Sequence, residues 1–223
     1  MTKELNIGIV GLGTVGSGVI KSIEKNKDYF KNNYDVKFNI IGISANSKKK
    51  KRSFNVDSYQ WFDEPLGLIS ENNIDTIIEL VGGEDGLAYE LAIHSLKNKM
   101  NFITANKALI SKHGEELASL SEENNNFFGF EASVAGGIPI IKTLKESIML
   151  NEIQKVFAIL NGTSNYILSS MSKLQISFKE ALKDAQDKGY AESDPTLDIN
   201  GEDTAHKLSI LNSIIFSEIP SVE

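Results

Sequence analysis

Residues 5–16 are Leu5-Asn6-Ile7-Gly8-Ile9-Val10-Gly11-Leu12-Gly13-Thr14-Val15-Gly16, and the expected architecture of the chain follows from them. The first six form a short, nearly continuous apolar run, which is typical of a strand buried on both faces. Glycines then follow with the spacing G-x-G-x-x-G, and an apolar helical pattern continues to Ile23. A strand, a glycine turn and a helix in this order predict a βαβ unit that binds a dinucleotide.

Each glycine of this turn has a physical role in that prediction. Gly11 permits the tight turn, Gly13 lets the backbone approach a pyrophosphate, and Gly16 lets the helix pack closely against the strand. The amides at the start of the helix, at Thr14 and Val15, would meet the phosphates with a favourable helix dipole. The alternative is a glycine turn without a ligand, but three glycines at this spacing are poor choices for packing alone.

Strands and helices alternate along the next hundred residues. Strands are expected at 38–43, 76–81, 101–104 and 127–130, and helices at 87–96 and 109–124. Such alternation predicts an α/β fold, a doubly wound parallel sheet of the Rossmann type with right-handed crossovers. We assign residues 1–131 to this NAD(P)-binding domain.

The pattern changes after residue 131. Helices are expected at 141–150, from Tyr166, at 178–188 and from about 201, with one strand at 156–160. This predicts a partial α+β substrate-binding and catalytic domain over residues 132–223. Two strands at most do not form a covered sheet, so the domain is expected to be incomplete at its C-terminal end.

Composition excludes several classes of protein. The chain has 223 residues, no cysteine, and 23 Lys and Arg against 30 Asp and Glu, a net charge of −7. The absence of cysteine rules out disulfides and a thiol nucleophile, and the acidic balance argues against a nucleic-acid partner. No apolar run is long enough to span a membrane, and the start lacks a signal-peptide pattern, so a cytoplasmic location is expected.

The choice of dinucleotide depends on the segment after the second strand. An NAD site places an acidic residue there for the ribose 2′-hydroxyl, whereas Ser44-Ala45-Asn46-Ser47 has none and Lys48–Arg52 follow. Neutral Asn46 and nearby cations favour NADP. A solvated, lysine-rich loop is an equally open interpretation.

Four downstream motifs resemble homoserine dehydrogenase. They are residues 104–109 (TANKAL), 131–139 (EASVAGGIP), 161–168 (NGTSNYIL) and 189–208 (GYAESDPTLDINGEDTAHKL), of which the last is the most specific. The resemblance covers essentially the whole chain in order. It implies interconversion of L-aspartate 4-semialdehyde and L-homoserine with NADPH or NADH, on the route to threonine, methionine and isoleucine.

Asp203 and Lys207 are the expected catalytic pair. They are four residues apart on a predicted helix, so both side chains can point into one cleft. Reduction of an aldehyde needs a proton at oxygen, and the resemblance makes Lys207 its donor and acceptor, with Asp203 orienting it. On spacing alone, an exposed i,i+4 ion pair is the simpler interpretation.

The resemblance also implies the residues that hold the substrate. Glu192 would anchor the α-ammonium group with Asp198 as a second acid, and Gly162 and Thr163 would contact polar groups of the substrate. Lys107 would contact both cofactor and substrate. Without the resemblance, these residues would be assigned to a solvated acidic loop and a surface lysine.

A monovalent cation site is implied around Glu131. In the family, one carboxylate and backbone carbonyls at the positions of Val134, Gly136 and Ile138 hold sodium, and oxygen ligands suit a hard cation. The histidines lack the spacing of a transition-metal site.

Family members continue well beyond residue 223, so the chain is expected to be truncated, and full-length members are expected to form homodimers. A second hypothesis follows: a catalytically silent dinucleotide-binding fragment of such an enzyme. A thiol-dependent semialdehyde dehydrogenase is excluded because the chain has no cysteine.

Overall fold

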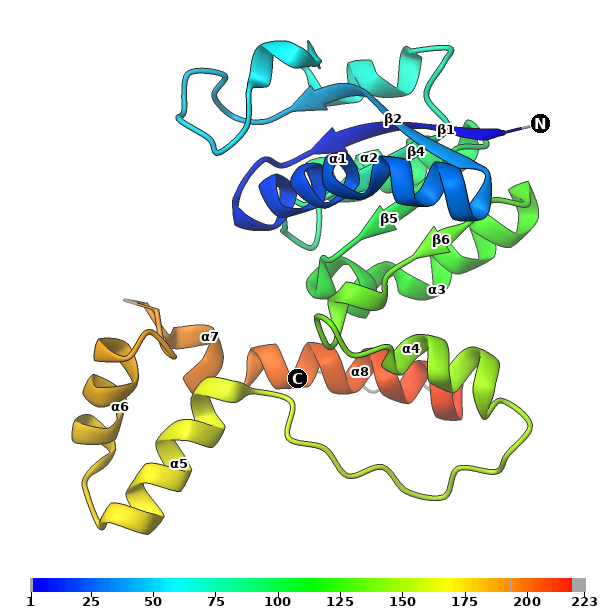
Figure 1. Ribbon diagram of the computed structural model, residues 1–223. Helices are drawn as coiled ribbons and strands as arrows, with labels where there is room; N and C mark the ends of the chain where they lie inside the picture. The colour runs from blue at the N-terminus through cyan, green and yellow to red at the C-terminus, as the bar shows by residue number, and fades with distance from the viewer. Residues whose placement is uncertain (1, 193, 218–223) are drawn as a thin grey trace. The chain divides into compact units, whose positions relative to one another are not determined.

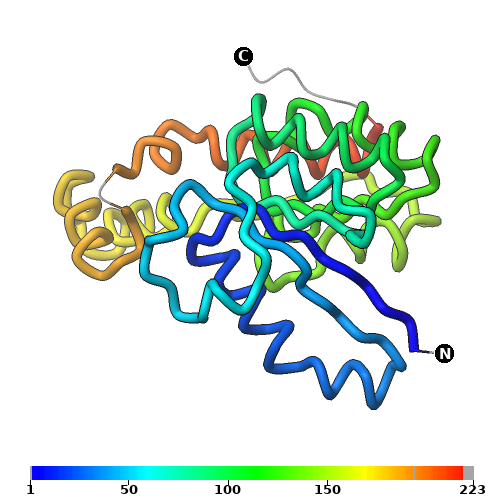
Figure 2. Tube along the Cα trace, turned by 90° about the horizontal axis from the view of Figure 1, so that it is seen from above, coloured from blue at the N-terminus to red at the C-terminus, as the bar shows by residue number. Residues whose placement is uncertain are grey.

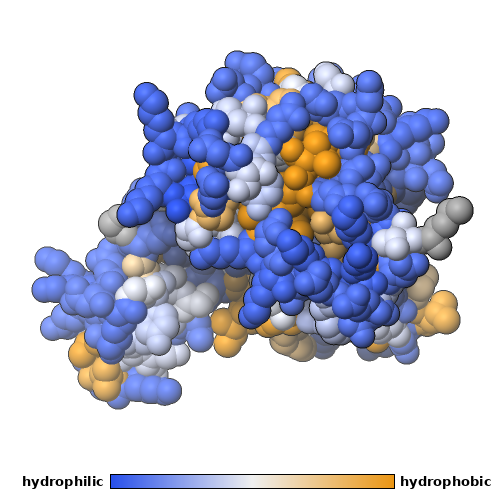
Figure 3. Space-filling view, turned by 45° about the horizontal axis from the view of Figure 1, so that its top comes forward, coloured by the Kyte–Doolittle hydropathy of each residue, from blue (hydrophilic) through white to orange (hydrophobic). Residues whose placement is uncertain are grey.

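The computed structural model describes residues 2–192 and 194–217. The chain divides into two compact units, Met1–Ser133, called the first unit, and Val134–Glu223, called the second unit. No helix in the described part of the chain is long and apolar enough to cross a membrane. The face shown in Figure 3 is mainly hydrophilic, with apolar side chains exposed in patches.

The first unit is built on a sheet of six described strands, all paired in parallel in the order β3-β2-β1-β4-β5-β6. The strands are β1 (Lys3–Val10), β2 (Val36–Ser44), β3 (Gln60–Trp61), β4 (Thr76–Glu79), β5 (Asn101–Thr104) and β6 (Phe128–Gly129). This strand order is that of a doubly wound dinucleotide-binding sheet, which confirms the predicted fold class. Strand β3 was not predicted because two residues carry no periodic pattern.

Helices cover both faces of this sheet (Figures 1 and 2). Ile20 of α1 (Thr14–Tyr34) packs with Ile9 and Ile43 on one face. On the other face, α2 (Leu87–Lys97) and α3 (Lys107–Asn124) pack against β4 and β5. The connections include the 3₁₀ helices η1 (Val56–Ser58), η2 (Pro65–Ser70) and η3 (Glu131–Ser133). Both faces of the central strands are therefore buried, which explains their unbroken apolar sequences.

The regular elements among the described residues of the second unit are all helical. Its elements are α4 (Ile140–Lys142), the π-helical turn η4 (Thr143–Ser147), α5 (Gly162–Leu174), α6 (Phe178–Asp187), α7 (Thr196–Ile199) and α8 (Glu202–Phe216). Ser177 begins α6 with a capping box: its hydroxyl accepts from the Glu180 amide, and the Glu180 carboxylate accepts from the Ser177 amide. A small core joins Ile167 of α5 to Ala181 and Ala185 of α6.

Two predicted elements of the second unit are wrong. Residues 156–160 form no strand but part of an irregular segment between η4 and α5, seen as the long loop in Figure 1. A strand needs a hydrogen-bonded neighbour, and the described residues of this unit contain no other strand to pair with it. Phe157 is 89% exposed as a result. The helix predicted at 141–150 ends at Ser147, where a π-helical turn gives way to a bend.

The contrast between buried and exposed apolar residues in the second unit gives a stability test. We expect Ile167→Ala to lower the free energy of unfolding by about 2–5 kcal/mol, because it removes a fully buried side chain. Phe157→Ser is expected to change it by less than about 0.5 kcal/mol. Chemical denaturation followed by circular dichroism measures both. A larger loss for Phe157→Ser than for Ile167→Ala would contradict the exposed position of this segment.

Candidate active site

The glycine turn between β1 and α1 has the geometry of a phosphate-binding loop. Gly11 has a φ of +96°, and a Cβ there would overlap the carbonyl group of Leu80. A Cβ on Gly16 would overlap the Gly11 carbonyl oxygen, so close packing requires both glycines. At Gly13 a Cβ would meet nothing within 4 Å, which leaves the backbone open to a ligand.

No side chain in the described part of the chain caps the amides at the start of α1. The N-cap residue is Gly13, which has no side chain that could accept from these amides, and the first turn contains no acidic residue. Thr14 and Val15 are exposed there. Uncapped amides with a positive helix dipole are suited to the phosphates of a dinucleotide. The residues present therefore fit that group.

Arg52 connects this turn to the loop after β2. Its guanidinium donates to the carbonyl oxygens of Leu12 at 3.3 Å and Ser47 at 2.8 Å, and further to those of Lys48 and Lys50. It also lies 5.8 Å from the centre of the Trp61 ring. Arg52 thus shapes the loop that carries Lys48–Lys51 by tying it to the glycine turn.

Glu79, at the end of β4, is a buried carboxylate that sequence reasoning missed. It accepts from the amides of Val81 at 2.7 Å and Gly82 at 3.0 Å, and from the Thr104 hydroxyl at 2.6 Å. Its side chain is fully buried. The network holds the loops after β4 and β5 at the carboxyl edge of the sheet, where ligands of doubly wound folds bind. The sequence signal was a charged residue inside an apolar strand.

Asn106 extends this network to α3. Its side-chain Nδ2 donates to the Gly83 carbonyl oxygen, and its side-chain Oδ1 accepts from the Leu109 amide and caps the helix. Lys107 follows as the first residue of α3, partly buried. The backbone at Lys107 is therefore held in place near the carboxyl end of β5.

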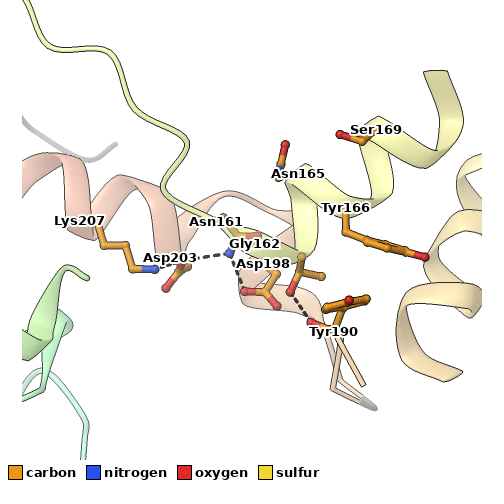
Figure 4. A pocket seen from close by; sticks show the side chains of 10 residues that line it. Asn161, Gly162, Asn165, Tyr166, Ser169, Tyr190, Asp198, Asp203 and Lys207 are labelled. Carbon is orange, nitrogen blue, oxygen red and sulfur yellow. Dashed lines mark hydrogen bonds and ion pairs between the residues drawn. The ribbon is translucent and has the colours of Figure 1, made fainter. Parts of the chain in front are cut away.

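A pocket of about 540 Å³ lies in the second unit, around the N-terminal turn of α5 (Figure 4). Residues from α5, α7 and α8 and the segment before α7 contribute to its wall. The lining residues are Asn161, Gly162, Thr163, Asn165, Tyr166, Ser169, Tyr190, Asp198, Asp203 and Lys207.

The Lys207 ammonium group is held by two acceptors. Its Nζ donates to Asp203 Oδ2 at 2.8 Å and to the carbonyl oxygen of Leu160 at 2.9 Å. The side chains of Lys207 and Asp203 are 19% and 9% exposed, so this is a largely buried ion pair rather than an exposed one. An ammonium group has three donors, and described residues accept two of them from Lys207. The third suits an oxygen atom of a ligand in the pocket.

Asn161 links two acids of the pocket. Its Nδ2 donates to Asp198 Oδ1 at 2.7 Å and to Asp203 Oδ2 at 2.9 Å, as Figure 4 shows. Its Oδ1 accepts from the Ser164 amide at 2.7 Å and caps α5. Sequence reasoning placed Asn161 in a motif but gave it no role, although Asn before a helix is a known capping signal.

The first turn of α5 also fixes the segments opposite it. The Thr163 hydroxyl donates to the Tyr190 carbonyl oxygen at 2.8 Å, and the Ser164 hydroxyl donates to that of Asp198 at 2.8 Å. A Cβ at Gly162 would meet nothing within 4 Å. Glycine therefore leaves the start of the helix accessible from the pocket.

Two tyrosines that sequence reasoning missed form one wall. The rings of Tyr166 and Tyr190 stack with their centroids 4.6 Å apart. The Tyr166 hydroxyl donates to Asp184 at 2.5 Å, and Lys188 also donates to this carboxylate. These two donors lower the pKa of Asp184 below its ordinary value. No charge or repeat marked the tyrosines in the sequence, because their proximity depends on the α5–α6 packing.

The structure brings together Gly162, Thr163, Asp198, Asp203 and Lys207 of the predicted site residues. Glu192 is not among the described lining residues. It is exposed, and its backbone carbonyl accepts from Gln186. Lys107 and the glycine turn belong to the first unit.

The predicted cation segment forms a tight turn after η3. The Ile138 amide donates to the Ala135 carbonyl oxygen at 3.1 Å, and Gly137 between them has a φ of +82°. Among described residues, no three His, Asp or Glu side chains gather as a metal site. The prediction, however, rests on Glu131 and backbone carbonyl groups.

Replacing Glu79 tests whether its hydrogen bonds stabilise the loops at the carboxyl edge of the sheet. We expect Glu79→Ala to lower the free energy of unfolding of the first unit by about 2–4 kcal/mol, because three donors lose their acceptor. Trp61, the single tryptophan, reports this transition by fluorescence during urea denaturation. Glu90→Ala, an exposed position of α2, is the control and should change it by less than about 0.5 kcal/mol. Equal effects of the two substitutions would refute the assigned role of Glu79.

Comparisons with known proteins agree with these features. The family model "Homoserine dehydrogenase, NAD binding domain" matches residues 11–131, and the model "Homoserine dehydrogenase" matches residues 139–223. Homoserine dehydrogenases of Helicobacter pylori and Neisseria gonorrhoeae are 46% and 39% identical over 97% and 96% of this chain. The chain spans about half the length of these relatives, 50% and 49%.

Solved structures show the same likeness. A crystal structure of Staphylococcus aureus homoserine dehydrogenase at pH 7.5 matches with a TM-score of 0.86 and 40% identity, over 99% of this chain and 52% of that one. A hyperthermophilic archaeal homoserine dehydrogenase mutant in complex with NADPH matches with a TM-score of 0.84 and 26% identity, over 97% and 71%. The glycine turn, the parallel sheet and both family models lead to one conclusion: the chain belongs to the homoserine dehydrogenase family.

Proposed function

We propose that this chain carries the dinucleotide site and the catalytic residues of an NAD(P)-dependent homoserine dehydrogenase, which interconverts L-homoserine and L-aspartate 4-semialdehyde. The observation that carries the proposal is the buried pair of Lys207 and Asp203 in a pocket lined by polar groups of α5 and α7. In this proposal the first unit binds the cofactor and the second unit binds the amino-acid substrate.

When bound, a nicotinamide dinucleotide would supply the hydride-transfer chemistry for the alcohol carbon of homoserine and the aldehyde. Gly11, Gly13, Thr14, Val15 and Gly16 would hold its pyrophosphate. The support for this is the open space beside Gly13 and the uncapped start of α1. Lys107 would contact cofactor and substrate from the start of α3.

In this proposal Lys207 transfers the proton in both directions of the reaction. When homoserine is oxidised, the neutral amine accepts the hydroxyl proton as the carbon–oxygen double bond forms. When the aldehyde is reduced, the ammonium group donates that proton to the oxygen. Asp203 and the Leu160 carbonyl fix the direction in which Nζ points, so that its remaining donor faces the pocket.

The other end of the substrate carries an ammonium and a carboxylate group. Asp198 would bind the ammonium group within the pocket, and Glu192 would add a second carboxylate. Thr163 and the exposed backbone of Gly162 would meet the polar groups of the substrate. The positive end of the α5 dipole at this point favours the substrate carboxylate.

We also propose that the cofactor is NADP rather than NAD, that sodium binds the oxygen atoms of Glu131, Val134, Gly136 and Ile138, and that the complete enzyme is a homodimer. The support for NADP is the lysine-rich loop that Arg52 ties to the glycine turn. The support for sodium is the chemistry of an all-oxygen donor set.

Removing the proposed proton donor tests the reaction. We expect Lys207→Ala to lower kcat for NADP-dependent homoserine oxidation by about 10²–10⁴-fold, because general acid–base catalysis contributes that much. The dissociation constant for NADPH should stay within about twofold, since Lys207 lies outside the glycine turn. Lys183→Ala, an exposed lysine of α6, is the control and should leave kcat unchanged.

Unchanged turnover in Lys207→Ala would exclude this residue as the proton donor. NADPH binding without any turnover by the unsubstituted chain would instead favour the second candidate, a silent dinucleotide-binding fragment. That candidate is kept because residues 156–160 lack a strand partner among the described residues.

The lysine-rich loop gives a separate test of cofactor preference. We expect the chain to bind NADPH at least about tenfold more tightly than NADH, and Lys49→Gln/Lys50→Gln/Lys51→Gln to remove most of this difference, because charge-assisted contacts to the 2′-phosphate are lost. Arg52 is left intact because it shapes the loop. Lys97→Gln/Lys99→Gln, just before the amino end of β5, is the control and removes two exposed lysine charges elsewhere in the same unit. Equal affinity of the unsubstituted chain for both dinucleotides would refute the preference.

A further inference from the structure

One side chain contacts both carboxylates of the pocket wall. The two Nδ2 hydrogens of Asn161 point to different carboxylates, at 2.7 Å from Asp198 and 2.9 Å from Asp203, and its Oδ1 accepts from the Ser164 amide. The side chain is buried, with 8% of the residue exposed. This arrangement fixes which end of the amide is nitrogen, because the reverse orientation would point its oxygen at two carboxylates.

The contact with Asp203 involves the oxygen that binds Lys207. Asp203 Oδ2 accepts from Asn161 Nδ2 at 2.9 Å and from Lys207 Nζ at 2.8 Å. Each hydrogen bond that Asp203 Oδ2 accepts from one donor reduces the negative charge that this oxygen presents to the other donor. Lys207 also donates to the carbonyl oxygen of Leu160, the residue before Asn161. The backbone and the side chain at the start of α5 therefore act on the same ammonium group.

We propose that Asn161 is a positioning residue for Lys207. Its amide group separates the carboxylates of Asp198 and Asp203, so that one stays available to the substrate and the other to Lys207. It also donates to the Asp203 oxygen that accepts from Lys207, so that this carboxylate holds the Lys207 ammonium group less strongly. This inference rests on the proposed function and adds a residue with no direct contact to the reacting atoms.

Capping of α5 is the other role of Asn161, and substitutions separate the two. Asp and Ser are good N-cap residues, so Asn161→Asp and Asn161→Ser keep an acceptor for the Ser164 amide. Both lose the donors to Asp198 and Asp203. Ser177→Ala is the matched control, because it removes the cap of α6 in the same unit and leaves the pocket unchanged.

The experiment compares the pH profile of kcat for homoserine oxidation with the rate at which acetic anhydride labels Lys207. Mass spectrometry locates the label, and exposed Lys173 of α5 is the internal reference. In Asn161→Asp a third carboxylate strengthens the hold on the Lys207 proton, so the rise of kcat should move up by about one pH unit. Labelling of Lys207 at neutral pH should slow about tenfold, since only the neutral amine reacts.

Asn161→Ser should lower kcat and should also slow labelling of Lys207. Ser177→Ala should lower the midpoint of thermal unfolding and leave labelling of Lys207 unchanged. Labelling rates in both Asn161 variants equal to that of the unsubstituted chain would overturn the proposal. If the unsubstituted chain does not oxidise homoserine, the proposed function fails, but the labelling rates still decide whether Asn161 acts on Lys207.

Discussion

The ion pair between Lys207 and Asp203 is the interaction on which the second unit depends most. It joins the first two turns of α8 to the segment before α5 through the carbonyl oxygen of Leu160. Breaking a buried pair by removing one partner is costly, because the other charge stays behind without a counter-ion. The surrounding donors reduce that cost: Asn161 donates to the same carboxylate, and its own oxygen begins α5. A single polar network thus sets both the positions of the helices and the direction of the ammonium group.

A comparable constraint organises the first unit. Glu79 is buried at the end of β4 and accepts from the loop that follows the strand and from Thr104 of the neighbouring strand. The loop after β4 also limits which residue can stand in the glycine turn, because the Leu80 carbonyl leaves no room for a Cβ at Gly11. The carboxyl edge of the sheet is therefore shaped by backbone contacts and one carboxylate, and Gly13 and the start of α1 remain accessible.

Local signals predicted most of the first unit. The glycine spacing from Gly11 to Gly16 and the apolar strands gave the parallel sheet, because strands buried on both faces leave a distinct sequence pattern. The second unit was harder to predict. Residues 156–160 have the composition of a strand. A strand forms only if a second strand pairs with it, and the local sequence does not show whether such a partner exists. Asp203 and Lys207 were found by spacing and resemblance, whereas the part played by Asn161 depends on three segments meeting in space.

The most direct measurement is a crystal structure of this chain with NADPH and L-homoserine bound. We expect homoserine to lie in the pocket at the start of α5, with its hydroxyl oxygen about 3 Å from Lys207 Nζ, a hydrogen-bond distance. Its ammonium group should face Asp198. Homoserine bound away from this pocket, or with its hydroxyl group turned away from Lys207, would show that this lysine does not carry the proton.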